Sequence, residues 1–306
     1  MKKQTLILGM AVILGISVLT SCEKEDEMNN PKAVSEMTVA EYAVSDPNFS
    51  TLVKALTKAN LVNTLNSAGD FTVFAPTNTA FDILFAELGV MGIDNLTAEQ
   101  LTPILLYHVL GKEVKSSMIM EGYVATLSPA QNSYLNLNIS LMGGVKLNKN
   151  TSVTTADVDV MNGVIHVIDK VLLPPTVVDH ALANENFSIL VSAVVKAGLV
   201  ETLMGDGPFT IFAPTNAAFQ ALFTQLGISG INDLTAEQLT PILLYHVVSG
   251  NVRSTGLSAG DVETLNGKIS IAISPKPSIN TDTNIIATDV QASNGVIHAI
   301  DKVLLP

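Results

Sequence analysis

The sequence has 306 residues, a length that exceeds the usual size of one hydrophobic core and suits two domains. Hydrophobic residues make up 47% of the chain and charged residues 14%, a composition that excludes disorder for most of it. The formal net charge of −12 makes the surface repel phosphate backbones, so we expect no nucleic acid partner.

The first 21 residues have the three parts of a secretory signal peptide. A pair of lysines is followed by an apolar run over 6–19, and small residues stand just before Cys22. The apolar run is shorter than the roughly 20 residues of a membrane-spanning helix. The segment LTSC resembles the bacterial lipobox, in which the signal peptide is cut before the cysteine and the cysteine carries lipid. We expect 1–21 to be removed and Cys22 to be lipidated; the alternative is a plain secretory signal.

Residues 22–34 are expected to form an acidic, solvated tether. The segment 23–27 is a cluster of charges with no apolar period, and Asn and Pro residues follow it. An acidic stretch beside a lipidated cysteine resembles the surface-export signal of lipoproteins in Bacteroidetes-type bacteria. This resemblance implies an outer-membrane lipoprotein exposed at the cell surface, with the lipid anchor as its membrane contact. The alternative is an ordinary spacer.

The remainder of the chain consists of two similar copies of one sequence. Two blocks recur 138 residues later and a third recurs 132 residues later, namely 71–89 at 209–227, 96–109 at 234–247 and 162–174 at 294–306. A period this long makes each copy a self-sufficient domain and not a stacking unit. We therefore predict one domain over 35–175 and a second over 176–306, with consecutive prolines at the junction.

The first half of each copy has the spacing of one-faced helices. Apolar residues follow the i, i+3, i+4, i+7 pattern at Phe49, Leu52, Val53 and Leu56, and again at Phe187, Leu190, Val191 and Val194. The segment 71–74, Phe-Thr-Val-Phe, predicts a short strand. The phenylalanines that follow it are interpreted as core residues of the next helix.

A capping box predicts where a further helix begins. Thr97 and Gln100 have the spacing at which each side chain can bond to the other residue's backbone amide. Pro103 predicts a second helical start, capped by Thr102, because proline suits the first turn of a helix. This helix is expected to end at the Tyr-His pair that follows.

After Gly111 the apolar pattern changes to period two, which predicts half-buried strands. The alternating residues are Leu135, Leu137, Ile139 and Leu141 in the first copy and Ile269, Ile271 and Ile273 in the second. Asn162-Gly163 and Asn294-Gly295 predict tight hairpin turns with positive φ at both central residues. Helices come first and strands afterwards, so the expected class is α+β with a mainly antiparallel sheet.

Three blocks, in the same order in both copies, resemble the signature segments of fasciclin-like domains. They are FTVFAPTNTAF, the Tyr-His pair and NGVIHVIDKVLLP with their second-copy equivalents. The resemblance covers nearly all of both copies. It implies an extracellular protein, a β-sheet wedge or sandwich packed with helices in each domain, and a role in adhesion or matrix interaction.

The same resemblance implies candidate partner-binding residues. In animal relatives, integrin recognition is attributed to the Tyr-His region and to an Asp-Ile dipeptide before the NGVIH-like turn. The matching positions here are Tyr107, His108, Asp157, Val158, Tyr245, His246, Asp289 and Val290. The Asp-Val dipeptides depart from Asp-Ile, and their neighbours differ from the animal motif. We therefore expect a protein or polysaccharide surface ligand and assign no integrin.

The histidines are expected to be structural. His108 shares the apolar face of its helix and is predicted to be a hydrogen-bonded core residue, whereas Tyr107 points elsewhere and is the better contact candidate. His166 and Asp169 fall on opposite faces of one strand, so they form no dyad. His180 stands where the first copy has Tyr42, which predicts a helix surface position.

We expect no catalytic residue, metal site or cofactor. The sequence has no nucleophile elbow, zinc-histidine helix, phosphate loop or dinucleotide fingerprint. The favoured function is a non-enzymatic surface lipoprotein that binds matrix, surface or protein partners through both domains. An alternative is a glycan or small-ligand receptor that aids nutrient capture at the outer membrane. A hydrolase that depends on His108 or His246 is the third hypothesis.

Overall fold

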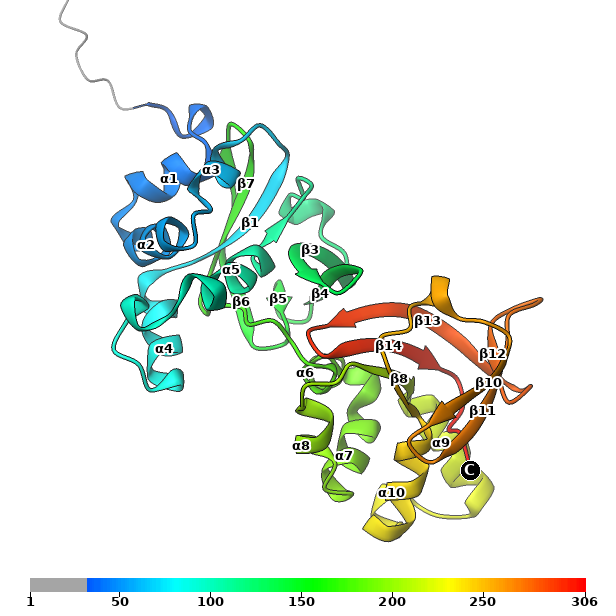
Figure 1. Cartoon of the computed structure of the whole chain (residues 1–306). Coiled ribbons are helices and arrows are strands. Elements are labelled where there is room, and N and C mark those ends of the chain that lie inside the picture. Colours follow the sequence, from blue (N-terminus) through cyan, green and yellow to red (C-terminus); the bar gives the residue numbers. More distant parts are fainter. Residues whose placement is uncertain (1–31) are drawn as a thin grey trace, which may run out of the picture. The chain divides into compact units, whose positions relative to one another are not determined.

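The computed structural model describes residues 32–306. The predicted signal peptide 1–21, Cys22 and most of the predicted tether lie outside the described residues. Within the described part of the chain, each repeat has five α-helices and one seven-stranded sheet (Figure 1). The predicted α+β class is confirmed.

The α-helices and strands of the two repeats correspond one to one. The first repeat consists of α1 (Val39–Ser45), α2 (Ser50–Lys58), α3 (Val62–Asn66), β1 (Phe71–Pro76), α4 (Asn78–Leu88), α5 (Ala98–Tyr107), β2 (Val109–Leu110), β3 (Gly122–Ala130), β4 (Ser133–Ser140), β5 (Lys146–Leu147), β6 (Thr151–Val160) and β7 (Gly163–Ile168). The second consists of α6 (Val177–Ala183), α7 (Ser188–Lys196), α8 (Val200–Met204), β8 (Phe209–Pro214), α9 (Asn216–Leu226), α10 (Ala236–Tyr245), β9 (Val247–Ser249), β10 (Gly260–Thr264), β11 (Gly267–Ala272), β12 (Ser278–Ile279), β13 (Thr283–Ala292) and β14 (Gly295–Ile300). Short 3₁₀ turns lie at Val34–Glu36, Pro47–Phe49, Ile93–Asn95, Ser116–Met118, Glu185–Phe187, Ile231–Asp233 and Ser254–Gly256.

The last strand of each repeat lies beside its first strand. The sheet order is β2-β1-β7-β6-β5-β4-β3 in the first repeat, and the second repeat has the same order from β9 to β10. The β1–β7 and β8–β14 pairs are parallel, and the other pairs are antiparallel. The mainly antiparallel sheet predicted from the sequence is therefore confirmed.

Both faces of β1 and β7 are covered. Val73 and Ile165 belong to a core formed with the helices, and Phe74 and Ile168 belong to a second core formed with residues of β4 such as Leu137. Figure 1 shows α1 and α2 on one side of β1 and β7, with β3 and β4 on the other. A strand buried on both faces is mostly apolar, which explains the sequence of β1; its one polar side chain, Thr72, is hydrogen-bonded to the carbonyl of Lys112 and the amide of Val114.

The capping box at the start of α5 is present, but the second helical start is wrong. Thr97 accepts a hydrogen bond from the Gln100 amide, and the Gln100 side chain accepts one from the Thr97 amide at 2.8 Å. One helix runs from Ala98 through Pro103 to Tyr107. Proline leaves the carbonyl of Glu99 without its helical donor, and Glu99 lies in an exposed first turn where water can hydrate that oxygen.

The hairpin between β6 and β7 differs from the predicted turn. Val160 pairs with Gly163, so Met161 and Asn162 form the two-residue loop, and Asn162 does not adopt a positive φ. Gly163 is required by a close approach, because a Cβ atom there would lie 2.0 Å from the carbonyl oxygen of Phe71. The glycine therefore allows β7 to pair beside β1.

Asn162 uses its side chain to connect this hairpin to the N-terminal helices. Its Oδ1 accepts a hydrogen bond from the Val39 amide at 2.9 Å. Its Nδ2 donates to the carbonyls of Leu65 and Ser67, both at 2.8 Å. Asn294 makes the same three contacts in the second repeat, with Val177, Leu203 and Gly205. One buried amide thus satisfies three backbone groups from two separate segments.

Replacing Asn162 with alanine should destabilise the first repeat by about 2–4 kcal/mol, because buried backbone groups would lose their partners. Urea unfolding followed by circular dichroism measures the change. Asn63→Ala, at an exposed position of α3, is the matched control and should change stability by less than about 0.5 kcal/mol. Equal stability of the two variants would contradict the proposed role of the Asn162 amide.

Candidate functional site

His108 is a core residue whose two ring nitrogens are both bonded. Its Nδ1 donates to the carbonyl of Ile104 at 2.7 Å, and its Nε2 accepts from the Leu172 amide at 2.9 Å. Burial lowers the pKa of His108 to about 4, so the ring is neutral at pH 7. The predicted structural position is confirmed.

His246 repeats this arrangement in the second domain. It bonds Ile242 at 2.8 Å and Leu304 at 2.9 Å, and burial lowers its pKa to about 4. In each domain the imidazole therefore links, by hydrogen bonds, the segment that follows the closing strand to the end of a helix. Neither ring nitrogen of His108 or His246 is open to a substrate or metal.

The expectation that Tyr107 is an outward contact residue is wrong. Tyr107 is 0% exposed, and its hydroxyl donates to the Asn136 carbonyl at 2.8 Å and accepts from the Asn148 side chain at 3.0 Å. The ring lies in the second core, where it packs with residues of β1, β4 and β7 such as Phe74, Leu137 and Ile168. Burial raises the pKa of the Tyr107 hydroxyl. Tyr245 is buried in the same way and donates to the Lys268 carbonyl at 2.6 Å.

The predicted surface position of His180 is also wrong. Its side chain is fully buried, and its Nε2 donates to the carbonyl of Gln291 at 3.2 Å. Its ring meets the edge of the Tyr123 ring at a centroid distance of 5.3 Å. Tyr42, at the equivalent place, is only half-buried, so the two repeats use this position differently.

The Asp-Val dipeptides lie on irregular strands. The pairing of β6 with β7 shifts register before Val158, and Asp157 adopts a left-handed φ of 60°. Extra residues in a strand bend it and re-aim a side chain, which here turns the Asp157 carboxylate to the surface. We call the segment 155–158 the first bulge.

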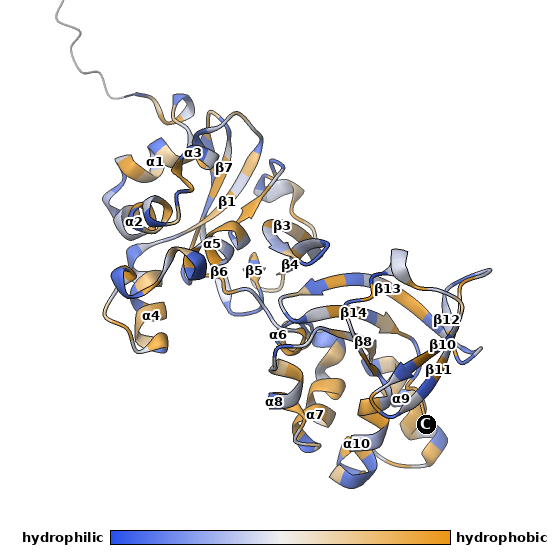
Figure 2. Cartoon of the chain, viewed as in Figure 1, coloured by the Kyte–Doolittle hydropathy of each residue, from blue (hydrophilic) through white to orange (hydrophobic). Residues whose placement is uncertain are grey.

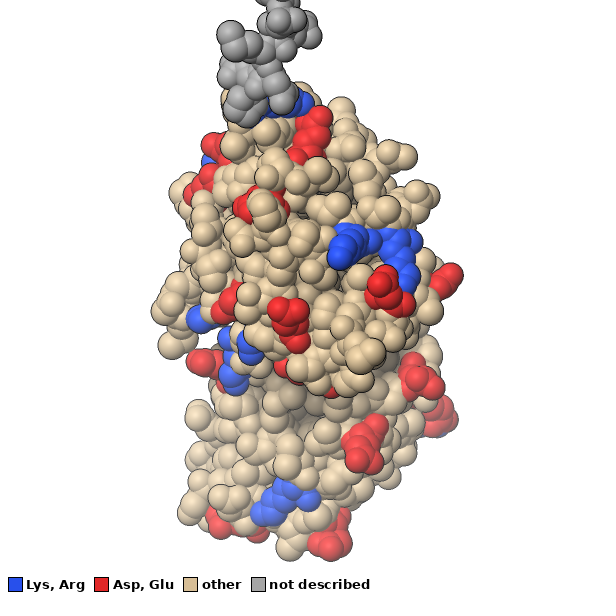
Figure 3. Space-filling model, turned by 90° about the vertical axis from the view of Figure 1, so that its left-hand side faces the viewer, with Lys and Arg blue, Asp and Glu red and all other residues tan. Residues whose placement is uncertain are grey.

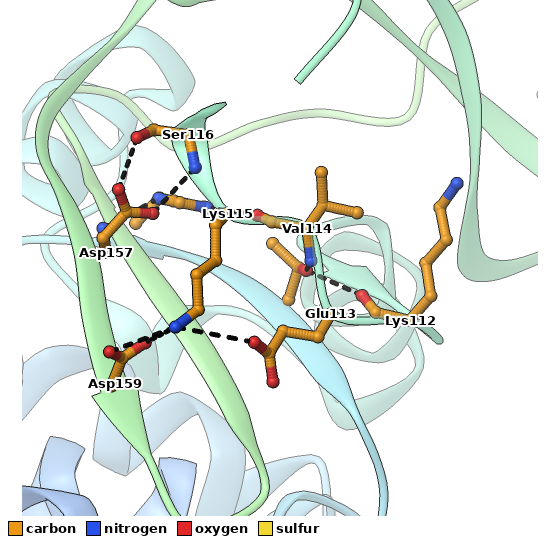
Figure 4. A network of polar contacts seen from close by, with 9 residues as sticks. Lys112, Glu113, Val114, Lys115, Ser116, Asp157 and Asp159 are labelled. Atoms are coloured by element: carbon orange, nitrogen blue, oxygen red, sulfur yellow. Dashed lines mark hydrogen bonds and ion pairs between the residues drawn. The ribbon is translucent and has the colours of Figure 1, made fainter. Parts of the chain in front are cut away.

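The Asp157 carboxylate is held by a residue that the sequence analysis did not select. The amide of Ser116 donates to it at 2.7 Å, and the Ser116 hydroxyl donates to its other oxygen. The hydrogen bonds from Ser116 hold the pKa of Asp157 below its ordinary value. Figure 4 shows the carboxylates of Asp157 and Asp159 both directed at the Lys115–Ser116 segment.

His166 holds the backbone of the first bulge through hydrogen bonds. Its Nδ1 accepts from the Asp157 amide at 3.2 Å, and its Nε2 donates to the Val114 carbonyl at 2.9 Å. Asp169 instead accepts from the Ser152 amide at 2.7 Å, so the prediction that His166 and Asp169 form no dyad is confirmed. The histidine therefore links the bulge to the loop that carries Ser116.

An exposed ion pair lies beside the first bulge. The Lys115 ammonium lies 3.0 Å from an oxygen of Asp159 and 3.9 Å from an oxygen of Glu113 (Figure 4). The bond to Asp159 raises the pKa of Lys115. Surface pairs of this kind add little to stability.

The second repeat keeps the bulge and changes its charges. Asp289 has a φ of 64° and accepts from the Ser254 amide at 2.7 Å, and its backbone donates to His298 at 3.3 Å. Burial raises the pKa of Asp289, but the Ser254 hydrogen bonds and the Arg253 charge outweigh it and leave the pKa lowered. Gln291 replaces Asp159, and it is buried against Asn251.

The structure does not bring the Tyr-His pairs and the Asp-Val dipeptides into direct contact. They are linked through Phe74, whose amide donates to the His108 carbonyl at 2.9 Å and whose ring stacks on His166 at 5.6 Å. Val158 is half-buried and Val290 is buried, whereas Asp157 is exposed and Asp289 is half-buried. A signal for Ser116 and Ser254 existed, since a basic residue and serine follow valine at the same place in both copies.

The described residues contain neither a metal-binding cluster nor a membrane-spanning helix. No group of three or more His, Cys, Asp or Glu side chains in residues 32–306 is placed to hold a metal ion. No helix in the same range is long and apolar enough to cross a bilayer. Figure 3 shows acidic and basic side chains scattered over one face without a large patch of one sign.

Stability should fall as the pH drops from about 6.5 towards 4. The pKa values of His108, His180 and His246 are about 4 when folded, below the ordinary value of about 6.5, so the unfolded chain takes up protons first. At pH 5 the loss should be on the order of 2 kcal/mol per histidine.

Urea unfolding at pH 7.5, 6 and 5 measures this loss. Histidine NMR signals of the folded protein should show no titration of the three rings over the same range. The control is His108→Asn, which should lower stability at pH 7.5 but flatten the pH dependence. A wild-type stability that is equal at pH 7.5 and pH 5 would contradict the assignment of neutral, buried rings.

The matches to known proteins correspond to the two repeats. The fasciclin domain model matches residues 47–174 and 185–306. Protein sll1483 of Synechocystis is 45% identical over 133 residues, which cover 43% of this chain and 73% of that protein. Transforming growth factor-beta-induced protein ig-h3 of Sus scrofa is 33% identical over 247 residues, 79% of this chain and 35% of that protein. Cell surface glycolipoprotein MPB83 of Mycobacterium bovis is 38% identical over 144 residues, 45% of this chain and 60% of that protein.

A solved structure shares the fold. It is a FAS1 domain pair from the insect cell adhesion molecule Fasciclin I, with a TM-score of 0.51 and 20% sequence identity. The match covers 85% of this chain and 97% of that one. The chain belongs to the fasciclin domain family and carries two copies of the domain.

Proposed function

We propose that this chain is a non-enzymatic adhesion or interaction lipoprotein, anchored by Cys22 in the outer membrane and exposed at the cell surface. Its family supports a general role in adhesion or at surfaces, since the named relatives include a cell surface glycolipoprotein and a cell adhesion molecule. The lipobox-like LTSC segment supports the anchor. The proposed ligand is a protein or polysaccharide.

The observation that carries the proposal is the Asp157 bulge. An exposed carboxylate is held there by two hydrogen bonds from Ser116, and the bulge backbone is held by His166. A charged group with a fixed direction loses little entropy when it binds, which favours recognition of a complementary surface. Lys115 and Asp159 lie beside it and add a cation and a second carboxylate.

The Tyr-His pairs contribute indirectly in this proposal. Tyr107 and His108 are buried, so they position the sheet and the closing segment and do not touch the ligand. Asp289 and Arg253 form the corresponding surface of the second domain, 3.7 Å apart. Two such surfaces in one chain raise avidity when both can reach the same target.

Reversing the charge of Lys115 should weaken attachment of cells to a matrix-coated surface. Lys115→Glu places a carboxylate beside Asp159 and repels the part of the ligand that the ammonium attracts, and we expect at least a tenfold loss of affinity. Cells that lack the gene are complemented with wild type or variant, and attachment is counted at equal surface expression. The matched control is Lys268→Glu, at another exposed ion pair, which should attach like wild type. Attachment of the gene deletion at wild-type level on every surface would contradict the function.

Cys22→Ala should release the protein from the membrane fraction, because a lipid anchor holds through its buried methylenes. Fractionation and immunoblotting measure the release. Protease treatment of intact wild-type cells should degrade both domains, while a periplasmic protein remains intact as the control. If Cys22→Ala stayed in the membrane fraction, the proposed lipid anchor would be contradicted. Resistance of both domains to protease on intact cells would contradict the proposed surface location.

A further inference from the structure

The second domain contains an apolar cavity of about 100 Å³ beneath α6 and α7. It lies among the helices and the helical face of the sheet, where Val177, Phe187, Leu190, Val194, Leu203 and Ile297 line it. His246 is the only polar residue of the lining, and both of its ring nitrogens are engaged elsewhere. No hydrogen-bonding group is therefore left to hold water inside.

The first domain has almost no cavity at the equivalent place. The space there measures about 20 Å³, and Tyr42 is part of its lining. The Tyr42 ring packs against Phe49 with centroids 6.0 Å apart. Leu56 also lines it, where the second domain has the smaller Val194. The two repeats share the same order of elements, and these side-chain differences lie at the place where the volumes differ.

His180 opens the cavity by turning away from it. The ring lies at the position of Tyr42 but is not among the residues that line the space. Its Nε2 instead reaches the Gln291 carbonyl at 3.2 Å. The volume that the Tyr42 ring fills in the first domain is consequently left empty in the second.

The cavity reaches solvent between α6 and α7. Two lining residues are exposed, Leu182 by 46% and Val195 by 60%. The position of Val195 holds Thr57 in the first domain, so the second domain carries an extra apolar residue at the opening. Figure 2 shows more of the hydrophobic colour on α7 than on α2. An exposed apolar residue beside an empty apolar cavity forms an entrance for a hydrocarbon.

We propose that this cavity binds the end of an unbranched alkyl chain, with the polar head of that ligand in solvent beyond Leu182 and Val195. The chemistry follows from the lining, which offers contacts only to hydrocarbon. The size selects a chain end, because an engineered apolar cavity that takes up benzene measures about 150 Å³. A free amphiphile or the acyl chain of a lipid could supply the same group.

Titration with n-alkanols from butanol to octanol tests this proposal on the full chain. Methyl-labelled valine and leucine signals are followed by NMR. We expect shifts at Val177, Val194, Val195 and Leu203. Burial of one methylene contributes about 0.8 kcal/mol, so Kd should fall about fourfold per added methylene until the cavity is full. Detergent-free vesicles of a phosphatidylcholine then distinguish the sources: shifts of the same methyl groups assign a lipid chain, and their absence assigns the free amphiphile.

Variants taken from the first domain test the site itself. Val194→Leu fills the cavity and should weaken octanol binding at least tenfold, and Val195→Thr should weaken it severalfold by making the entrance polar. Both residues already occur at these places in the first domain, at Leu56 and Thr57, so the fold should tolerate them. The control is Leu56→Val in the first domain, where Tyr42 remains, and octanol affinity should be unchanged.

Three results would overturn the proposal. The first is a set of shifts spread over the surface without saturation. The second is a Kd that does not depend on chain length. The third is unchanged octanol binding by Val194→Leu in a protein whose circular dichroism shows it to be folded. Cell attachment is measured separately, so failure of the adhesion proposal leaves this test unaffected.

Discussion

The parallel pairing of the first and last strands of each repeat is the constraint on which the rest of the structure depends. β1 and β7 are separated by nearly the whole sheet in sequence, yet Phe71 pairs with Gly163 and Pro76 with Ile168. Closing so long a loop costs chain entropy, which must be offset by burial. The two cores on opposite faces of this pair supply that burial. Asn162 and His108 then hold the segments on either side of β7 in place.

The features that depend on local pattern could be predicted from the sequence. The strand β1, the capping box at Thr97 and the core position of His108 each follow from neighbours within one turn or strand. The burial of Tyr107 was not predicted, because its helix has apolar contacts on two sides. A periodic stripe identifies one buried face, and the second core against β4 becomes visible only when the sheet is assembled.

The contacts at the candidate site are long-range, and this is why the sequence did not reveal them. Ser116 meets Asp157 across 41 residues, and His180 meets Gln291 across 111. Contacts at such large sequence separations produce no periodic pattern in the sequence. Comparison of the two copies is more informative than either alone. Positions such as Ser116 and Ser254 repeat because the geometry needs them, whereas Asp159 and Gln291 differ because only one of them stays exposed.

The left-handed backbone at Asp157 and Asp289 limits how these surfaces can diverge among relatives. Asparagine, aspartate and glycine tolerate that conformation, whereas β-branched residues resist it. An asparagine could keep the Ser116 amide as its donor, so the charge of the bulge can be lost without any rearrangement of the main chain. A single isosteric exchange can thus change the charge of this surface, whereas a bulky apolar residue at the same position would add backbone strain.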